Sequence, residues 1–210
     1  MNSVRHLKSS ATPAPLAAAL TLAAMLTLAG FSQPALAAPH TYEIDPEHFS
    51  IGFQVEHVGY AKTIGLFLKG SGQFVYDEET RELSSGRVVV AADSVFTNHK
   101  KRDGHLRDRD FLQANRHPEI VFEATRYTPG ADNKGKLEGN LTILGQTHPV
   151  TLDITLNKIA PYPFGHRKHT LGASATTTLQ RSKWGMTYAV EAGMVGDDVE
   201  LMLEFEALRQ

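Results

Sequence analysis

Histidine is the residue type in this chain that most directly suggests a metal site. The sequence has ten histidines and no cysteine, which excludes thiolate zinc sites, thiol redox chemistry and cysteine-ligated haem. His166 and His169 are three apart, a spacing that suits one helical face, but they stand in a predicted loop. The sequence contains no Glu-x-x-His, His-Glu-x-x-His or Gly-x-Ser-x-Gly element, so it predicts no catalytic residues, metal ligands or cofactor.

Three other polar side chains stand where they could meet a ligand. His57 and His148 each continue the apolar alternation of a predicted strand and lie at its end, and Arg181 continues the parity of Leu179. Two interpretations remain open. They are hydrogen-bonded core residues, or they mark the mouth of a pocket and contact the polar head group of a bound molecule.

Alternating apolar and polar residues predict the strands that would position these side chains. Residues 51–57 alternate with period two, and residues 147–156 give the most regular alternation in the chain. Similar patterns recur at 64–76, 88–95, 120–125, 137–143, 171–179 and 199–207. About eight short strands joined mostly by tight turns are typical of an antiparallel barrel or sandwich.

Small residues stand at predicted inward positions of these strands. They are Ala124, Gly139, Ala173 and Ala175, each beside larger apolar neighbours. Small side chains on a concave face leave volume for a ligand, and an eight-stranded barrel is just wide enough to hold a small one. The alternative is that they relieve crowding where a packed barrel tapers.

Residues 99–115 break the alternation and predict one short helical insertion. Asp103 and Arg107 are spaced i, i+4, a spacing that suits ion pairs on a solvated helix. Thr97 or Asn98 could cap the helix, and Pro118 prevents its continuation. We expect the helix to cover one end or flank of the sheet as a lid, with Leu106 and Phe111 inward and the Asp/Arg pairs in water. The alternative is an ordinary solvated connection.

The first residues are typical of a secretory signal. A positive start with Arg5 and Lys8 precedes an apolar run over 16–31 and the small-residue site Ala35-Leu36-Ala37. We therefore expect a signal peptide over 1–37, a single domain over 38–210 and a soluble periplasmic product; a membrane anchor is the alternative. Residues 38–210 hold 19 Lys/Arg against 23 Asp/Glu, a charge of −4, which argues against nucleic acid as a partner.

Several ordered motifs resemble one family over the whole of residues 38–210. They are Tyr42-Glu43-Ile44-Asp45, 53–57 (FQVEH), 103–107 (DGHLR), 110–112 (DFL), 117–122 (HPEIVF), 137–142 (LEGNLT), 145–152 (GQTHPVTL) and 179–186 (LQRSKWGM). Together they resemble the YceI-like family of exported lipocalin-like proteins. The run Ser182-Lys183-Trp184 departs from the family's more usual pattern.

The resemblance implies an all-β fold, an eight-stranded antiparallel lipocalin-like barrel, that binds an isoprenoid quinone or another amphiphilic lipid without covalent attachment. The resemblance implies no catalytic residues. We expect storage or transport with transient membrane contact, as a monomer or dimer; the alternative is an enzyme or redox accessory protein acting on a lipid in the same cavity. The predicted lipid-contacting residues are Phe53, Val55, His57, Leu66, Phe74, Val90, Leu106, Phe111, Phe122, Leu141, His148, Leu152, Ile154, Ala175, Arg181 and Leu203.

Overall fold

The computed structural model describes residues 38–210, and the predicted signal peptide lies outside the described residues. Strands dominate this part of the chain, as the alternation predicts. In order, the elements are β1 (His40–His57), β2 (Ala61–Phe67), β3 (Gly70–Asp77), β4 (Glu82–Ala91), η1 (Ala92–Ser94), β5 (Val95–Phe96), α1 (Lys100–Arg107), β6 (Glu119–Pro129), β7 (Lys134–Ile143), β8 (Gln146–Pro161), β9 (His169–Gln180), η2 (Arg181–Trp184) and β10 (Val195–Arg209).

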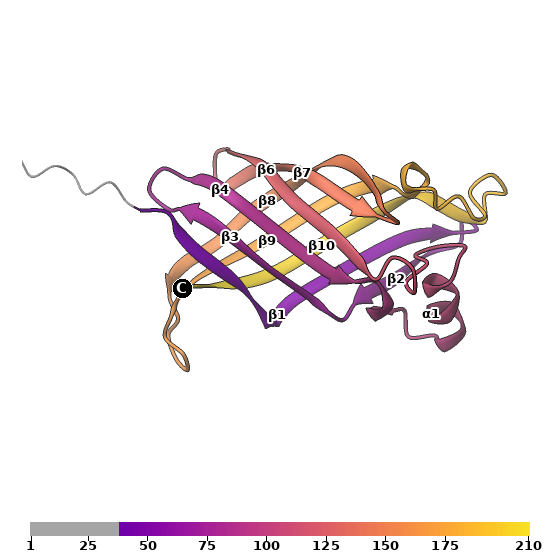
Figure 1. Cartoon of the computed structure of the whole chain (residues 1–210), viewed down its shortest axis with the longest axis horizontal. Helices are drawn as coiled ribbons and strands as arrows, with labels where there is room; N and C mark the ends of the chain where they lie inside the picture. The colour runs from indigo at the N-terminus through magenta and orange to yellow at the C-terminus, as the bar shows by residue number, and fades with distance from the viewer. Residues whose placement is uncertain (1–37) are drawn as a thin grey trace, which may run out of the picture. The chain divides into compact units, whose positions relative to one another are not determined.

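The strands form one antiparallel sheet that closes on itself. Its order is β10-β9-β8-β7-β6-β4-β3-β1-β2-β5, and β10 also pairs with β1. The first half of β1 pairs with β3 and its second half with β2, while β5 pairs with β2 and β4 with β3. Thus β2 and β3 share one position around the barrel, and β4 and β5 share another. This confirms the predicted eight-stranded antiparallel barrel (Figure 1).

Alternation along β1 sets which side chains enter the barrel. Ile51 and Phe53 are 6% and 8% exposed, whereas Gln54 between Phe53 and Val55 points the other way and donates to Glu200 Oε2. Directly opposite residues of an antiparallel pair share a face. Thr63, Gly65 and Phe67 lie opposite Val55, Phe53 and Ile51, so they are the inward residues of β2.

The outward residues of β2 are therefore its aliphatic ones. Ile64 and Leu66 are 66% and 40% exposed, and Leu68, just beyond the strand, is 62% exposed. The predicted apolar face of this segment thus points to solvent, because the register with β1 overrides the local pattern.

The helical insertion is shorter than predicted. Helix α1 spans Lys100–Arg107, and its cap is His99, whose Nδ1 accepts from the Arg102 amide at 3.2 Å. Turns follow it, in which the Leu112 and Ala114 amides donate to the Leu106 and Arg107 carbonyls. The helix lies at one end of the barrel (Figure 1); we call this the helix end.

The buried side chains form two clusters, one toward each end of the barrel. The larger surrounds the helix end and includes Phe53, Val95, Leu112 and Trp184. The smaller contains Tyr42, Ile44, Tyr76, Leu171, Ala173 and Ala207, and we call this the packed end. Among residues 38–210, no helical segment has the length and hydropathy of a membrane-crossing helix.

Candidate functional site

A cavity of about 540 Å³ occupies the barrel interior, lined mostly by the apolar inward residues of its strands. It extends from Ile44 and Tyr76 at the packed end to Tyr188 and Met194 at the helix end. This volume lies within the range of about 300–1,000 Å³ typical of small-molecule sites. The barrel is therefore hollow along most of its length.

All but two of the predicted lipid-contacting side chains belong to residues that line this cavity. Leu106 and Phe111 are among them, so the helical segment does turn these two side chains inward over the barrel, as a lid would. The predicted residues in the lining are Phe53, Val55, His57, Phe74, Val90, Leu106, Phe111, Phe122, Leu141, Leu152, Ile154, Ala175, Arg181 and Leu203.

Leu66 and His148 lie outside the cavity lining, and both predictions need correction. Leu66 points outward because its neighbours Gly65 and Phe67 face Phe53 and Ile51. His148 lies half-buried at the start of β8, opposite Leu141 and on the same parity as Val150, but its ring packs edge-on against Trp184, with ring centroids 5.1 Å apart, and it is not part of the cavity lining. Val150, two residues later, is the first cavity-lining residue of β8.

The cavity opens at the helix end. Tyr188 and Met194 line it and yet are 44% and 47% exposed, and His57 is also exposed. At the packed end the lining residues Tyr76 and Leu171 are only 4% and 2% exposed. A ligand would therefore enter between the end of β1, helix α1 and the segment before β10.

Arg181 lines the cavity, but its guanidinium is committed to the backbone around the opening. Nε donates to Gly196 O at 2.8 Å and Nη1 to Met186 O at 2.6 Å. Nη2 donates to Tyr188 O and Val195 O at 2.8 and 2.9 Å. Burial lowers the pKa of Arg181, with nearby Asp197 opposing that effect. Arg181 thus fixes residues 186–196, and few of its donors remain for a head group.

Three rings from two segments close part of the opening. Phe111 contacts Tyr188 with ring centroids 5.4 Å apart, and His105 packs edge-on against both at 5.0 Å. The Arg181 guanidinium lies 5.6 Å from the Phe111 ring centroid, a cation–π arrangement. His105 also lies within hydrogen-bond distance of Asp110, 2.9 Å from its carboxylate. These contacts hold the helical segment against residues 186–194.

Asp103 anchors the start of the helical segment, contrary to the predicted solvated ion pair with Arg107. Its side chain is buried and accepts from Thr97 N at 2.7 Å and Thr97 Oγ1 at 2.5 Å. Desolvation pushes its pKa upward, but the hydrogen bonds from Thr97 outweigh it and hold the pKa below its usual range. The carboxylate of Asp103 is therefore hydrogen-bonded to Thr97, just before the helix, instead of facing solvent.

At the packed end, a polar network surrounds Glu78. Tyr42 Oη donates to its carboxylate, His169 Nε2 lies 3.1 Å from it, and Arg209 Nη1 lies 3.5 Å from it. Desolvation acts to raise the pKa of Glu78, but the hydrogen bonds from Tyr42 and His169 hold it below its usual range. This network joins the chain after β3 to β1, β9 and β10.

The small inward residues play two different roles. Gly65 and Gly139 each lie beneath an aromatic ring, those of Phe53 and Phe122, and any side chain at either position would collide with that ring. Ala175, by contrast, is 3% exposed and lines the cavity. Thus the glycines relieve crowding, while alanine at position 175 leaves open volume.

Asp45, His48 and Glu206 form a separate cluster at the kink in β1. Each offers one ligand atom within 4.8 Å of the others, and none of them lines the cavity. His48 Nδ1 is already 2.7 Å from Asp45 Oδ2, and that hydrogen bond raises the pKa of His48. Asp45 and His48 are thus a hydrogen-bonded pair beside the register shift between Ile44 and Phe49, and Glu206 Oε2 lies 3.9 Å from His48 Nδ1.

The chemistry of the cavity is mostly that of an apolar surface. At the helix end the lining includes the titratable residues Glu56 and His57 at the end of β1 and Arg102 and His105 of α1, while Tyr76, Arg87 and Tyr127 line the cavity farther along the barrel. Among the described lining residues, no hydrogen bond joins a hydroxyl to a histidine as a nucleophile and base would require. The arrangement suits an apolar chain with a polar group near the opening.

Sequence reasoning missed several lining residues. Trp184, Met186 and Tyr188 follow β9 in a segment without alternation, and Phe49 lies just beyond the kink in β1. The only available signal was composition: Trp184 is the sole tryptophan of the chain. Its Nε1 donates to Leu141 O at 3.1 Å, so it packs beneath the opening with its one polar atom satisfied.

Comparison with known proteins gives one consistent match. The sequence profile of the YceI-like domain matches residues 42–207. A UPF0312 protein of Pectobacterium atrosepticum is 34% identical over 191 residues, covering 91% of this chain and 95% of that protein. A UPF0312 protein of Pseudomonas aeruginosa is 34% identical over 193 residues, covering 92% and 97%.

Solved structures share the barrel. The YceI protein of Campylobacter jejuni superposes with a TM-score of 0.67 at 27% identity, covering 74% of this chain and 90% of that one. BcnA of Burkholderia cenocepacia gives 0.68 at 19% identity, covering 78% and 98%. A polyisoprenoid binding domain from Saccharophagus degradans gives 0.59 at 12% identity, covering 80% and 98%. The last two likenesses concern the fold alone.

Proposed function

Because the chain belongs to the YceI-like family, matching it over residues 42–207, we propose that its barrel binds a long-chain amphiphilic lipid. An isoprenoid quinone or a molecule of similar shape is the ligand class we favour. The protein would store or carry this lipid in the periplasm, where the signal-like features of residues 1–37 would direct it. The lipid would be exchanged during transient contact with a membrane.

The observation that carries this proposal is the shape and polarity of the cavity. A long hollow of about 540 Å³ is lined mostly by apolar residues, and Glu56, His57, Arg102 and His105 line its open end. Burial of an apolar tail along such a tube stabilises the complex by about 25 cal/mol per Å² of apolar surface removed from water. The polar groups at the opening fix which end of the lipid faces outward.

His57 and His105 are the main candidates for head-group contact, with Arg102 beside them, whose Nε and Nη2 donate to Thr97 Oγ1 and Thr97 O at 2.8 Å. His57 ends β1 at the opening, while Arg102 and His105 come from α1, and all three belong to the cavity lining. Arg181 would act on the ligand indirectly, by holding residues 186–196 in place. We propose a binding protein rather than an enzyme, since the described lining residues form no nucleophile–base pair.

Narrowing the cavity provides the test. Ala175→Phe adds a ring inside the barrel, whereas Thr176→Phe adds the same ring on the outer surface of the same strand, because Thr176 is exposed. Lipids extracted into organic solvent from each purified protein would be identified and quantified by mass spectrometry. We expect one dominant amphiphile from the unaltered protein and from Thr176→Phe, and at least about a fivefold lower yield from Ala175→Phe.

Two outcomes would contradict the proposal. One is the recovery of no lipid from repeated preparations of the unaltered protein. The other is equal lipid yield from the two phenylalanine variants, which would place any extracted lipid outside the cavity. Near-ultraviolet circular dichroism would show whether Ala175→Phe retains its tertiary packing, and Ala175→Leu offers a smaller insertion on the same side.

A further inference from the structure

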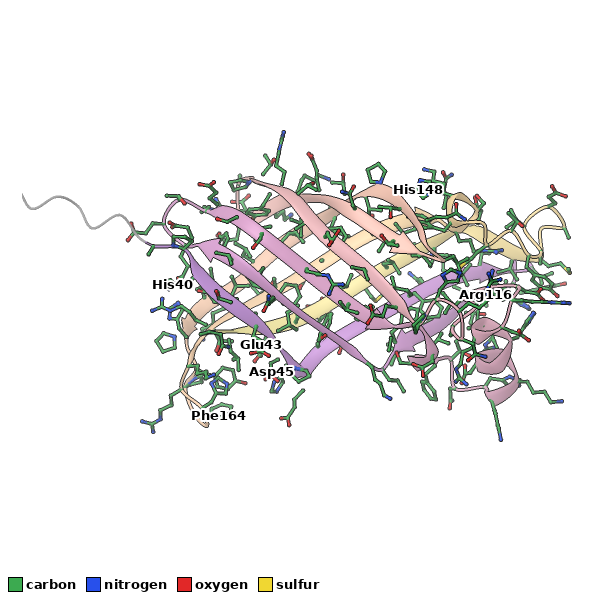
Figure 2. The ribbon with its side chains drawn as sticks, in the orientation of Figure 1. His40, Glu43, Asp45, Arg116, His148 and Phe164 are labelled. Carbon is green, nitrogen blue, oxygen red and sulfur yellow. The ribbon has the colours of Figure 1, made fainter. Side chains whose placement is uncertain are left out.

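The outer surface near the cavity opening is unusually apolar. Residues 38–210 expose ten large apolar side chains. All but Phe164 lie in the half of the barrel nearer the helix end or on the outer surface beside that half. Tyr60 is 92% exposed and Ile64 is 66% exposed. Phe164 lies at the opposite end (Figure 2). Single exposed apolar residues are ordinary on a protein surface, but a gathered set marks an interaction site.

These side chains form one connected surface, which we call the apolar apron. Leu66 on β2 lies opposite Phe96 on β5, and Gly52 on β1 lies opposite both Leu66 and Met202. A Cβ at Gly52 would stand 3.0 Å from Met202 Cγ and 3.7 Å from Leu66 Cδ2, so these two side chains converge over the glycine. The apron comprises Val58, Tyr60, Ile64, Leu66, Leu68, Phe96, Met194 and Met202.

The apron continues to the rim of the opening. The Val58 amide donates to Met194 O at 3.0 Å, which joins the β1–β2 turn to the segment before β10. Met194 also lines the cavity. The apolar outer surface and the apolar interior therefore meet at Met194.

Other strands do not share this pattern. The outward positions of β8 and β9 carry polar residues such as Thr151, Asp153, Thr176 and Thr178, all exposed or half-buried. Polar outward and apolar inward residues are what an ordinary water-facing barrel shows. On β2 the outward residues Ile64 and Leu66 are aliphatic, while the inward residues are Thr63, Gly65 and Phe67, so this strand carries apolar residues on both faces.

Basic side chains border the apron. Helix α1, which packs against β5, exposes Lys100, Lys101, Arg102 and Arg107. Residues 98–117 hold six Lys/Arg against three Asp, and one of those acids, Asp103, is buried against Thr97. This segment is therefore cationic in a domain whose formal charge is negative.

Acidic residues also lie near the apron, and two of them are already paired. Glu200 pairs with Lys62, and Asp110 lies 2.9 Å from His105. Other exposed acids remain nearby: Glu56 and Glu191 at the rim, Asp93 in η1, Asp108 directly after α1 and Asp198 in β10. On the far side of the patch, Lys69 is exposed directly after Leu68. Positive charge thus borders the apolar side chains along both α1 and β2.

We propose that the apolar apron and the basic face of α1 form a docking surface for an anionic lipid bilayer. Aliphatic and aromatic side chains would enter the interface between head groups and acyl chains, while the α1 lysines and arginines would contact lipid phosphates. This inference rests on the proposed function in one respect: docking would bring the cavity opening to the membrane. The surface itself is argued from exposure and charge alone.

Vesicle co-sedimentation tests the surface directly. The purified protein would be mixed with vesicles of phosphatidylethanolamine and phosphatidylglycerol, or of phosphatidylcholine alone. We expect binding to the anionic vesicles, weakened by salt as the screening of charge requires, and much weaker binding to the neutral ones.

Two variants divide the surface into its apolar and charged parts. The triple variant Ile64→Thr/Leu66→Thr/Leu68→Thr replaces three apolar side chains of the apron with threonine, a residue that β8 and β9 carry on their outer faces. We expect it to bind anionic vesicles about tenfold more weakly. Lys100→Gln/Lys101→Gln removes two exposed charges, for which we expect at least about fivefold weaker binding and a smaller salt dependence.

Matched controls place the same changes elsewhere. Phe164→Thr removes an apolar side chain that is 66% exposed at the packed end, and Lys134→Gln/Lys136→Gln removes two exposed charges from β7. Both should bind vesicles as the unaltered protein does. The lysine variants lie on the surface and test the proposal even if the threonine variant folds poorly.

Three results would overturn the proposal. They are a lack of binding to anionic vesicles, an equal loss in the control variants, or a dimer in light scattering that the threonine variant alone disrupts. The last would identify a second copy of the chain as the occupant. If lipid is extracted from the cavity but the protein does not bind vesicles, the docking surface is refuted and the proposed function stands. If the protein binds vesicles but yields no cavity lipid, the proposed function is refuted and the docking surface stands.

Discussion

The two ends of the barrel use buried polar groups in different ways. At the packed end, Glu78 gathers Tyr42, His169 and Arg209 from three strands, and the surrounding aromatic side chains are buried. At the helix end, Arg181 holds four backbone carbonyls of the segment that borders the cavity. Tyr188, one of the residues so held, remains 44% exposed.

This difference suggests a division of labour between the ends. The packed-end network joins strand to strand, so it stabilises closure of the barrel itself. The Arg181 contacts join a strand end to a loop, so they stabilise the shape of the opening. Ordered structure without full burial is what a ligand entrance requires, because its residues must be positioned and still yield to a passing molecule.

The largest effect should come from breaking the helix end at Arg181. Arg181→Met would leave the carbonyls of Met186, Tyr188, Val195 and Gly196 without their donor. Buried acceptors that lose their partners cost about 1–3 kcal/mol each before relaxation. We expect the free energy of unfolding, measured with urea, to fall by about 3–4 kcal/mol.

Lys183→Met provides the control for Arg181, because Lys183 belongs to the same short helix η2 and is exposed. It should change the unfolding free energy by less than about 0.5 kcal/mol. Arg181→Lys should recover only part of the stability, since an ammonium cannot reproduce the planar fork of donors. Equal stability of the Met variants at the two positions would contradict the assigned role.

A smaller effect is expected from breaking the packed end at Glu78. Glu78→Gln keeps the size of the side chain but removes the charge that His169 and Arg209 face. Hydrogen bonds to a charged group contribute about 1.5–3 kcal/mol, and Gln retains part of this. We expect a loss of about 1–2 kcal/mol in the free energy of unfolding near neutral pH.

The Glu78 contribution should also depend on pH in one direction. The pKa of Glu78 is lower in the folded chain than its usual value of 4.5. The stability it adds is therefore complete above that usual value and is lost as the pH falls through the folded pKa. The difference between the unaltered protein and Glu78→Gln should shrink between about pH 6 and pH 3. A difference that grows with acid would contradict this assignment.

The smallest stability effect, and the sharpest contrast between the ends, should come from Tyr188. Tyr188→Ala removes ring contacts with His105 and Phe111 at the opening, which should cost about 1 kcal/mol. Release of a fluorescent fatty acid, followed by stopped-flow mixing, should become several-fold faster because the ring closes part of the entrance.

Tyr162 offers a matched control for Tyr188. Its ring packs against Phe164 at 5.0 Å and His166 at 4.5 Å in a loop at the other end. Tyr162→Ala removes a similar trio of rings and should leave ligand release unchanged. If both variants released the probe equally fast, the opening would not lie at the helix end.

The sequence predicted the inward face of β1 but not that of β2, and the reason is register. Phe53 and Val55 belong to a long alternating run, so their inward parity follows from the pattern alone. In β2 both parities carry apolar residues, Ile64 and Leu66 on one and Phe67 on the other. The pairing of Gly65 with Phe53 determines which parity faces the cavity. The local alternation of residues does not predict such pairing between strands.

The candidate site divides in the same way. Leu106 and Phe111 were predicted to turn inward and do line the cavity, since they are the large apolar residues of a polar segment. The partners of Asp103 and Arg181 were not predictable. Thr97 approaches Asp103 through a loop, and the carbonyls that Arg181 binds lie in residues 186–196, where no periodic pattern fixes the backbone.

The pairing of β1 with β10 has a consequence for how the chain folds. Tyr42 lies opposite Arg209, so the contact that closes the barrel joins nearly the first described residue to nearly the last. Contacts between such distant positions slow folding, because the entropy of ordering a long loop is lost before the contact forms. Until β10 is in place, β1 and β9 both present free backbone edges, which are the surfaces through which strands of different molecules aggregate.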